Sequence, residues 1–563
     1  MRLSPLLVLA PLGLLGLAAC QTESGPSAGR AAGLDIPEVE AVDIAEATIK
    51  DLTQMLSDDS FEGRAPGSIG EEKTIALLTE RFAAAGLKPG NGDSWLQNVP
   101  LVGIEANKVS PLTISGGKTP LAFNYGSEMV IGTYRETETI EIIDSDVVFV
   151  GFGINAPEKG WNDYAGLDVK GKTVVILVND PDYASVDLTG DFGGKAMTYY
   201  GRWTYKYEEA ARQGAAAALI VHEDFPAAYG WGVVESSWTG PQFFAQSKDR
   251  GARQTMANGW IQKGVAEQLL ASAGQDFAQL SKAAKQKGFK PVPLGLKASV
   301  SFANSITTTR SNNIIGILPG AKRPDEYVLY TAHWDHLGRC KPAPDGDDIC
   351  NGAVDNATGT AALVALAEAF AKAGAPDRSI VFLAVTAEES GLLGSKYYAE
   401  NPVYPLKQTV GGINMDAFLM AGPAKDVTVI GKGKSQLDNF LSAALKSVDR
   451  VATADSSPQN GYYYRSDHFS LAKLGVPMLY INGGEDLING GVAAGAAVSK
   501  DYTENRYHGP KDEFNPAWDW SGVMADLALY YRIGRSMAMS TSWPNWVDGD
   551  EFRAVRDESR MGS

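Results

Sequence analysis

The sequence is poor in histidine and cysteine and has no strongly basic stretch. Its 563 residues include five histidines and three cysteines, and the formal net charge is −17 at pH 7. Because no stretch rich in lysine and arginine could neutralise phosphates, a nucleic-acid partner is excluded. After the first twenty residues, no apolar run is long enough to cross a bilayer. The hydrophobic content of 44% is that of an ordinary globular protein, and the length predicts two or three domains.

The first twenty residues have the pattern of an export signal. Arg2 precedes the apolar stretch 6–17, which is too short to span a membrane stably. The small residues before Cys20 resemble the lipobox of bacterial lipoproteins, in which cleavage leaves an acylated cysteine; a plain secretory signal is the alternative. We expect a signal peptide over 1–19, a flexible tether over 20–44, and export to the bacterial cell envelope with a lipid anchor at Cys20. Gln21 after the cysteine favours the outer membrane.

Two cysteines remain after Cys20. Cys340 and Cys350 are close in sequence, and in an oxidising compartment they predict a disulfide that closes a short loop. Metal ligation is the alternative.

Patterning divides the rest of the chain into three stretches. Residues 45–139 begin the main domain with helices, one of which starts at the capping-box pattern of Ser68 and ends near Gly86. Residues 140–300 contain β-rich runs such as "GKTVVILVND" and predict a separate insert, in which the lone His222 is expected to be structural. Residues 301–563 alternate buried strands with helices, which is typical of an α/β layer architecture.

Polar residues that can bind metals follow the strands predicted in this last stretch. They are His333, Asp335, Asp355, Glu388, Glu389 and Asp416, joined far downstream by His508. Sites in open α/β sheets lie at strand ends, and buried imidazoles and carboxylates without partners are costly. This mixture of ligands favours Zn²⁺ over Ca²⁺ or Mg²⁺. The spacing alone predicts a metal site and leaves the chemistry open.

The motifs "AHWDHLG", "VDNATGTAAL", "TAEESGLLGS", "NMD" and "YHGPKDE" occur in this order. In combination they resemble the dizinc aminopeptidase family that includes glutamate carboxypeptidase and the secreted bacterial leucine aminopeptidases. The stretch "DYAGLDVKGKTVVILV" resembles the protease-associated (PA) domain of that family. The resemblance covers nearly everything after residue 45. It implies the α/β three-layer zinc-exopeptidase fold, a mixed central sheet flanked by helices, with an inserted β-rich PA domain.

The resemblance also implies two Zn²⁺ ions per chain. Asp355 would bridge them. His333 and Asp416 would complete one zinc site. Glu389 and His508 would complete the other.

Three further residues take catalytic or supporting roles by the same resemblance. Glu388 would be the general base that deprotonates the bridging water and passes the proton to the leaving amine. Asp335 would orient the imidazole of His333. Tyr507 matches a tyrosine that steadies the oxyanion in some members. His336 and His468 are not used as ligands in the family pattern and are expected to be structural or at the pocket rim.

We therefore expect an exported zinc aminopeptidase that acts on peptides with a free N-terminus. A glutaminyl cyclase-like enzyme with one zinc and a non-catalytic, receptor-like binding protein are the alternatives, and the complete ligand set argues against both. Carboxypeptidase activity stays open within the main expectation. It would need a basic pocket for the free carboxylate, for which Arg465 and Arg506 are candidates.

Overall fold

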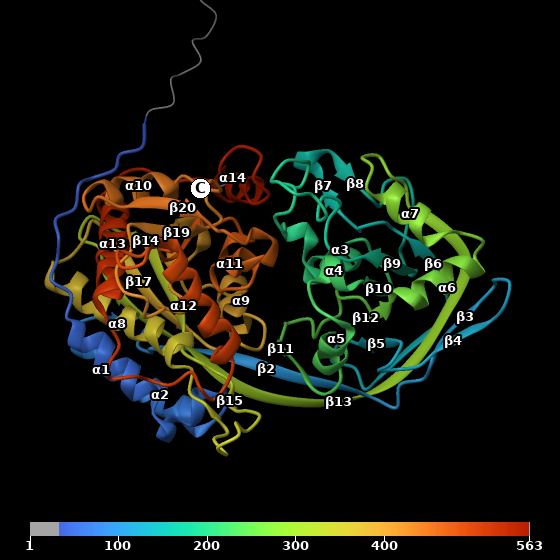
Figure 1. Ribbon diagram of the computed structural model, residues 1–563, viewed down its shortest axis with the longest axis horizontal. Helices are drawn as coiled ribbons and strands as arrows, with labels where there is room; N and C mark the ends of the chain where they lie inside the picture. Colours follow the sequence, from blue (N-terminus) through green and yellow to red (C-terminus); the bar gives the residue numbers. More distant parts are fainter. Residues whose placement is uncertain (1–32, 562–563) are drawn as a thin grey trace, which may run out of the picture.

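Two long strands connect the two halves of the molecule. The computed structural model describes residues 33–561. In it, β2 (Leu96–Asn107) and β13 (Val292–Leu318) pair antiparallel along the whole length of β2. The first half of β13 pairs with strands of the insert, and its last residues pair with β17 of the main body. Figure 1 shows the two bodies side by side, with β2 and β13 running between them.

The main body is built on a mixed sheet. The strands β17, β14, β18 and β21 are parallel neighbours in this order, with β13 antiparallel on one side and β19 antiparallel on the other. The bounds are β1 (Lys88–Pro89), β14 (Arg323–His333), β17 (Arg378–Val385), β18 (Thr409–Asn414), β19 (Asp426–Ile430), β20 (Val451–Ala454) and β21 (Met478–Gly483).

Helices cover both faces of this sheet. Val328 and Tyr330 of β14 pack into the core under α1, α2, α8, α10 and α13, whereas Tyr327 and Leu329 face α9 and α11, because successive strand residues point to opposite faces. The bounds are α1 (Glu46–Leu56), α2 (Ile69–Ala84), α8 (Gly359–Lys372), α9 (Leu393–Glu400), α10 (Leu437–Lys446), α11 (His468–Ala472), α12 (Gly491–Asn505), α13 (Ser521–Met539) and α14 (Arg553–Met561). The predicted three-layer α/β architecture is confirmed.

The insert has a second mixed sheet of its own. Its strands β6, β9, β10 and β12 are parallel neighbours, and β5 is antiparallel at the edge. The strands are β3 (Leu112–Ser115), β4 (Leu121–Phe123), β5 (Met129–Gly132), β6 (Thr139–Phe149), β7 (Asn155–Ala156), β8 (Trp161–Asn162), β9 (Thr173–Leu177), β10 (Ala217–His222), β11 (Gln242–Ala245) and β12 (Ala257–Gln262). The helices are α3 (Trp203–Arg212), α4 (Asp224–Ala227), α5 (Trp231–Trp238), α6 (Lys263–Ser272) and α7 (Phe277–Ala284).

The boundary of the insert needs a correction. Residues 108–139, which the sequence places in the main domain, form β3, β4 and β5. Leu112, Phe123 and Ile131 of these strands are buried in the same core as Phe149 and Leu219. The insert therefore begins near residue 108 and not at 140, because these short strands carry too few apolar residues to be recognised before their partners are known. Its kinship with a PA domain stays a prediction.

Residues 33–44 also differ from the expected flexible tether. Leu34, Ile36 and Val39 pack against the helical core, and α13 holds the segment through hydrogen bonds from Ser536 Oγ to the Pro37 carbonyl and from Arg532 to the Val39 carbonyl. The apolar side chains of this segment therefore contact the helical core. The signal peptide and Cys20 lie outside the described residues. Within residues 33–561, no helix combines the length and the apolarity that crossing a bilayer requires.

Several local predictions are confirmed. The Ser68 side chain accepts hydrogen bonds from Gly70 N and Glu71 N at the start of α2. Cys340 and Cys350 form a disulfide next to the short strands β15 (Gly338–Arg339) and β16 (Ile349–Cys350). His222 is buried, with Nε2 3.0 Å from the Tyr229 carbonyl.

A compact set of contacts fixes the insert against the main body. The ring of Tyr199 contacts those of Phe469 and Tyr464, and its hydroxyl donates to Glu208. Glu208 also pairs with Lys473 at 2.7 Å. Burial would raise the pKa of Glu208, but Lys473 outweighs this effect and the pKa lies below its usual value. The interface therefore depends on an ionised Glu208.

Replacing Lys473 with Met should lower the free energy of unfolding by about 1–3 kcal/mol, because it leaves the Glu208 carboxylate without its cation. Since the folded pKa is depressed, this contribution is present above the ordinary pKa of 4.5 and should fade as the pH falls below it. Urea denaturation at several pH values measures the effect. The exposed Lys500→Met variant is the control and should change stability by less than about 0.5 kcal/mol. Equal losses in both variants would contradict the role of the pair.

Candidate metal centre

The predicted site residues meet at one edge of the main sheet. His333 is the last residue of β14, Glu388 and Glu389 follow β17, and Asp416 follows β18. These three strands are parallel neighbours, so their carboxyl ends reach the same edge. Asp355 lies in the irregular turn Ala353–Thr358 before α8, and its peptide bond to the next residue is cis. His508 follows α12.

Asp355 occupies the centre of the group. Its Oδ1 lies 3.2 Å from Nε2 of His333, and its Oδ2 lies 3.4 Å from Nε2 of His508. On one side, Asp416 Oδ1 is also 3.2 Å from His333 Nε2. On the other, Glu389 Oε2 is 3.0 Å from His508 Nε2. The two oxygens of one carboxylate thus face two separate ligand sets.

These distances fit zinc coordination. Nitrogen and oxygen ligands lie about 2.0–2.2 Å from Zn²⁺, so two ligands of a tetrahedral ion are roughly 3.4 Å apart. The four nitrogen–oxygen separations of 3.0–3.4 Å match this spacing. The donor set of imidazoles and carboxylates also suits zinc. The residues present can therefore hold two ions, with Asp355 between them.

The backbone around the site is strained at several points. Ala387, Ala417 and His508 are not glycine, yet all have φ between 52° and 58°, a region that costs free energy for residues with a side chain and that clusters at functional sites. Gly352 has φ 54°, and a Cβ there would lie 2.1 Å from the Asp355 carbonyl oxygen. The turn that presents Asp355 therefore requires glycine at this position.

Asp335 supports the site in a different way from the one predicted. Its backbone carbonyl lies 3.1 Å from His333 Nδ1, whereas its carboxylate is 3.8 Å from that nitrogen. The carboxylate instead accepts from the backbone N–H groups of Glu388 and Glu389. Burial raises the pKa of Asp335 to about 7. Asp335 thus orients the imidazole through its main chain and anchors the glutamate pair through its side chain.

Three supporting residues were not identified from the sequence. Ser466 Oγ donates to Asp416 Oδ2 at 2.5 Å. Asp512, which is buried, accepts from the backbone N–H groups of Val354 and Asp355. Arg64 is fully buried and donates to four backbone carbonyls, including those of residues 334, 351 and 352. For Asp512 the only sequence signal was its place inside the motif "YHGPKDE".

The site concentrates negative charge. Burial raises the pKa of Glu388 well above its usual value, and the neighbouring carboxylates of Glu389 and Asp416 add to this shift. Burial alone would lower the pKa of His508, but hydrogen bonds to Asp355 and Glu389 raise it to about 10. The carboxylates therefore strongly favour positive charge beside each of the two imidazoles.

His336 is buried and does not lie at the pocket rim, and its Nδ1 is 2.6 Å from Glu389 Oε1. The structural role expected from the sequence stays a prediction. Three groups of side chains could each hold a metal ion, because within each group the ligand atoms lie within 4.8 Å of one another. They are His333–Asp355–Asp416, His333–Glu388–Glu389 and His336–Asp355–Glu389, and the last includes His336. His468, by contrast, is buried between Tyr463 and Tyr480 and away from the ligand set.

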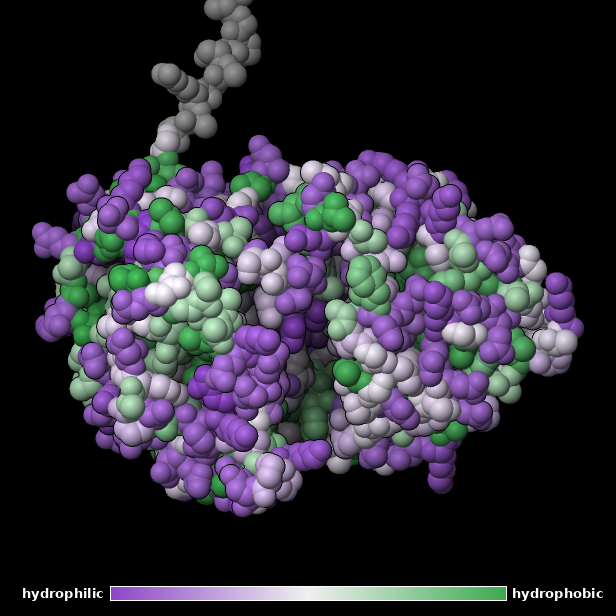
Figure 2. Space-filling model, in the orientation of Figure 1, coloured by the Kyte–Doolittle hydropathy of each residue, from purple (hydrophilic) through white to green (hydrophobic). Residues whose placement is uncertain are grey.

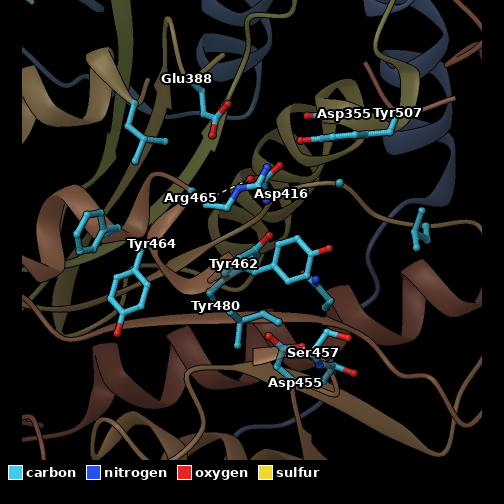
Figure 3. A pocket seen from close by; sticks show the side chains of 18 of the residues that line it. Asp355, Glu388, Asp416, Asp455, Ser457, Tyr462, Tyr464, Arg465, Tyr480 and Tyr507 are labelled. Carbon is cyan, nitrogen blue, oxygen red and sulfur yellow. Dashed lines mark hydrogen bonds between the residues drawn. The ribbon is translucent and has the colours of Figure 1, made fainter. Parts of the chain in front are cut away.

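A cavity of about 800 Å³ opens in front of the site, between the two bodies. Figure 2 shows the hollow between them, and Figure 3 shows Glu388, Asp416 and Tyr507 around it. Tyr507 stacks on His508 with ring centroids 3.8 Å apart. Of the two candidate arginines, Arg465 lines the cavity, whereas Arg506 pairs with Asp501.

The comparisons with known proteins concern mainly this body. Residues 313–532 match the model of peptidase family M28, and this range contains every predicted metal ligand. The match begins well after residue 45, where the resemblance was expected to start.

Curated relatives resemble part of the chain. Aminopeptidase NAALADL1 of Mus musculus is 32% identical over 179 residues, which are 30% of this chain and 22% of the mouse protein. Glutamate carboxypeptidase 2 homolog of Caenorhabditis elegans is 29% identical over 198 residues, 34% of this chain and 24% of the relative. The chain thus spans less than a quarter of the length of these relatives.

Solved structures similar to the chain include an aminopeptidase from Aneurinibacillus sp. strain AM-1, with a TM-score of 0.44 and 21% identity over 88% of this chain and 93% of that one. BSAP, a zinc aminopeptidase from Bacillus subtilis, gives a TM-score of 0.41 and 18% identity over 88% and 95% of the two chains.

Replacing Arg64 with Met should destabilise the main body by about 3–5 kcal/mol, because four buried carbonyls lose a charged donor. Thermal and urea unfolding measure the loss. Arg310→Gln, which removes an exposed arginine of β13, should change stability by less than about 0.5 kcal/mol. An Arg64→Met protein as stable as the wild type would show that the turn before Asp355 does not depend on this side chain.

Proposed function

We propose that the protein is a zinc-dependent aminopeptidase with two metal ions per chain. The observation that carries the proposal is the position of Asp355, whose two carboxylate oxygens face His333 and His508 at 3.2 and 3.4 Å. A single-zinc site of the glutaminyl cyclase type would not require a second set of ligands on the other side of Asp355. The ligands are His333, Asp355 and Asp416 at one ion, and Asp355, Glu389 and His508 at the other.

Bound zinc would supply Lewis acidity and lower the pKa of the attacking water. Glu388 lines the cavity, and burial raises its pKa well above its ordinary value, so it holds a proton more readily than an exposed glutamate. It therefore suits the transfer of a proton from the attacking water to the leaving amine. Asp335 fixes the backbone of Glu388 and so keeps this carboxylate in place.

Tyr507 supports the same reaction. It lines the cavity next to His508, and burial raises the pKa of its phenol above the usual value. The hydroxyl therefore stays protonated and can donate a hydrogen bond to the oxyanion that forms when the peptide carbonyl is attacked.

His336 completes the second ion's surroundings. Its short contact with Glu389 Oε1 leaves Glu389 Oε2 to face His508. Either as a hydrogen-bond donor or as an added ligand, the imidazole fixes the orientation of Glu389.

Adding zinc to the metal-stripped full chain should restore hydrolysis of aminoacyl anilides, with activity rising up to two zincs per chain. Glu388→Gln should bind zinc equally but lose about 10²–10⁴-fold in kcat, because it removes the proton acceptor and not a ligand. Glu504→Gln, on the surface of α12, is the control. Turnover that does not depend on zinc, or a fully active Glu388→Gln protein, would overturn the proposal.

Replacing His336 with Gln should weaken the binding of one of the two zincs by about 10–100-fold. Equilibrium dialysis with metal analysis gives both affinities without depending on turnover. His222→Gln, in the insert, should bind zinc like the wild type. Two unchanged affinities in His336→Gln would mean that His336 only fills space beside Glu389.

A further inference from the structure

Part of the cavity forms a side pocket whose floor is the end of the main sheet. Its floor is made by β19 and β21, which pair antiparallel with Ile430 opposite Tyr480 and Thr428 opposite Asn482. These four side chains line the cavity, because alternate residues of a strand point to the same face. The side pocket is therefore built on rigid strands of the main body.

One end of the side pocket adjoins the metal centre. Burial raises the pKa of Tyr480 well above its usual value, and the negative charge of Asp416 adds to this shift, so the phenol lies close to a metal-site carboxylate. In Figure 3, Tyr480 is seen between Asp416 and Asp455. A residue whose carbonyl carbon is attacked at the metal centre would lie beside Asp416, and the side pocket is the space that its side chain would enter.

The far end of the side pocket carries two carboxylates without a cation. Asp455 follows β20 and Glu485 follows β21, and both line the cavity. Burial raises the pKa of Asp455, and the charge of Glu485 adds to this effect, so the two carboxylates lie near each other. Among residues 33–561, neither carboxylate forms an ion pair with a lysine or an arginine. Arg450 also lines the cavity, but it pairs with Asp526 at 2.8 Å.

Hydrogen bonds and close packing hold both carboxylates in place. Ser457 N donates to Asp455 Oδ1 at 2.8 Å, and Ser456 Oγ donates to Glu485 Oε1 at 3.0 Å. Gly495 of α12 packs so closely on the other side that a Cβ there would lie 2.3 Å from the Glu485 carbonyl oxygen. The two acidic side chains are thus oriented by the segments that carry them.

Thr428 on the floor of the side pocket also lacks a partner. Its side chain is only 6% exposed, and its Oγ1 has no hydrogen-bond partner among the described residues. A buried hydroxyl without a partner costs free energy. An occupant with N–H donors would satisfy this hydroxyl and the two carboxylates together.

We propose that the side pocket binds the basic side chain of an N-terminal lysine or arginine, so that peptides that begin with these residues are the preferred substrates. This inference rests on the proposed peptidase function. Ile430 and Tyr480 would contact the methylene stem, and Asp455 and Glu485 would bind the charged end. Along β21, Tyr480 and Asn482 are about 6–7 Å apart, which is close to the roughly 6 Å reach of a lysine side chain.

Substrates of similar shape and different charge test the side pocket. The zinc-loaded full chain is given the para-nitroanilides of lysine and norleucine, and those of arginine and citrulline. We expect kcat/KM to be on the order of tenfold higher for the charged member of at least one pair, because only that member brings a cation to the two carboxylates.

The variants Asp455→Asn and Glu485→Gln should lower kcat/KM for the charged anilide and leave the value for its neutral counterpart close to that of the wild type. Glu485→Lys should make the neutral anilide the better substrate, which a merely structural role would not do. Asp486→Asn is the matched control, because it removes the same charge from the next residue, whose carboxylate pairs with Lys425. It should keep the wild-type preference.

Two results would overturn the side pocket while the peptidase function stands. One is equal kcat/KM for the charged and neutral anilides in the wild type. The other is an equal loss for both anilides in Asp455→Asn and Glu485→Gln, because the carboxylates would then bind the α-ammonium group that all these substrates share.

Binding to the zinc-loaded Glu388→Gln protein, measured by calorimetry with lysinamide and norleucinamide, distinguishes failure of the proposed reaction. If no anilide is cleaved but lysinamide binds more tightly, and adding Glu485→Gln removes the difference, the side pocket stands and the proposed reaction is wrong. If the two amides bind equally, the side pocket is wrong whatever the reaction.

Discussion

The contact of Asp355 with two histidines is the interaction on which the rest of the site depends. One carboxylate faces His333 through one oxygen and His508 through the other. Around it lie further carboxylates, among them Glu388, Glu389 and Asp416, whose mutual repulsion would be severe in a buried position. Positive charge between the carboxylates, from bound metal or from protonated imidazoles, relieves this repulsion.

The surrounding fold holds this charged group in place. Three parallel strands bring their carboxyl ends together, which fixes His333, the glutamate pair and Asp416 on rigid elements. Asp355 lies in a turn and not at the end of a strand. The carboxylate of Asp512 accepts hydrogen bonds from the backbone of this turn, and Arg64 donates to the carbonyls just before it. Because Arg64 is a buried cation that bonds only to carbonyls, it stabilises the turn and offsets part of the negative charge.

The second body has a geometric role that follows from how it is attached. Two long paired strands, and not flexible linkers, join it to the main body, and the aromatic contacts of Tyr199 fix it beside the metal centre. The cavity is therefore lined from both bodies. This places Arg202 of the insert on the same cavity wall as Arg465 of the main body.

The sequence by itself determined the α/β layers, the strand ends, the helix cap at Ser68 and the candidate metal ligands that the fold brings together at one edge of the main sheet. These depend on local patterns, because apolar runs that end in polar residues mark strands and their sites, and the remaining identification came from motifs in a fixed order. Only the tertiary structure decided what depends on distant partners. The strands of residues 108–139 and the packed segment 33–44 find their apolar partners far along the chain. Likewise, Arg64 and His336 acquire their surroundings from groups that folding brings beside them, because burial and electrostatic environment are properties of the assembled structure and not of any local stretch.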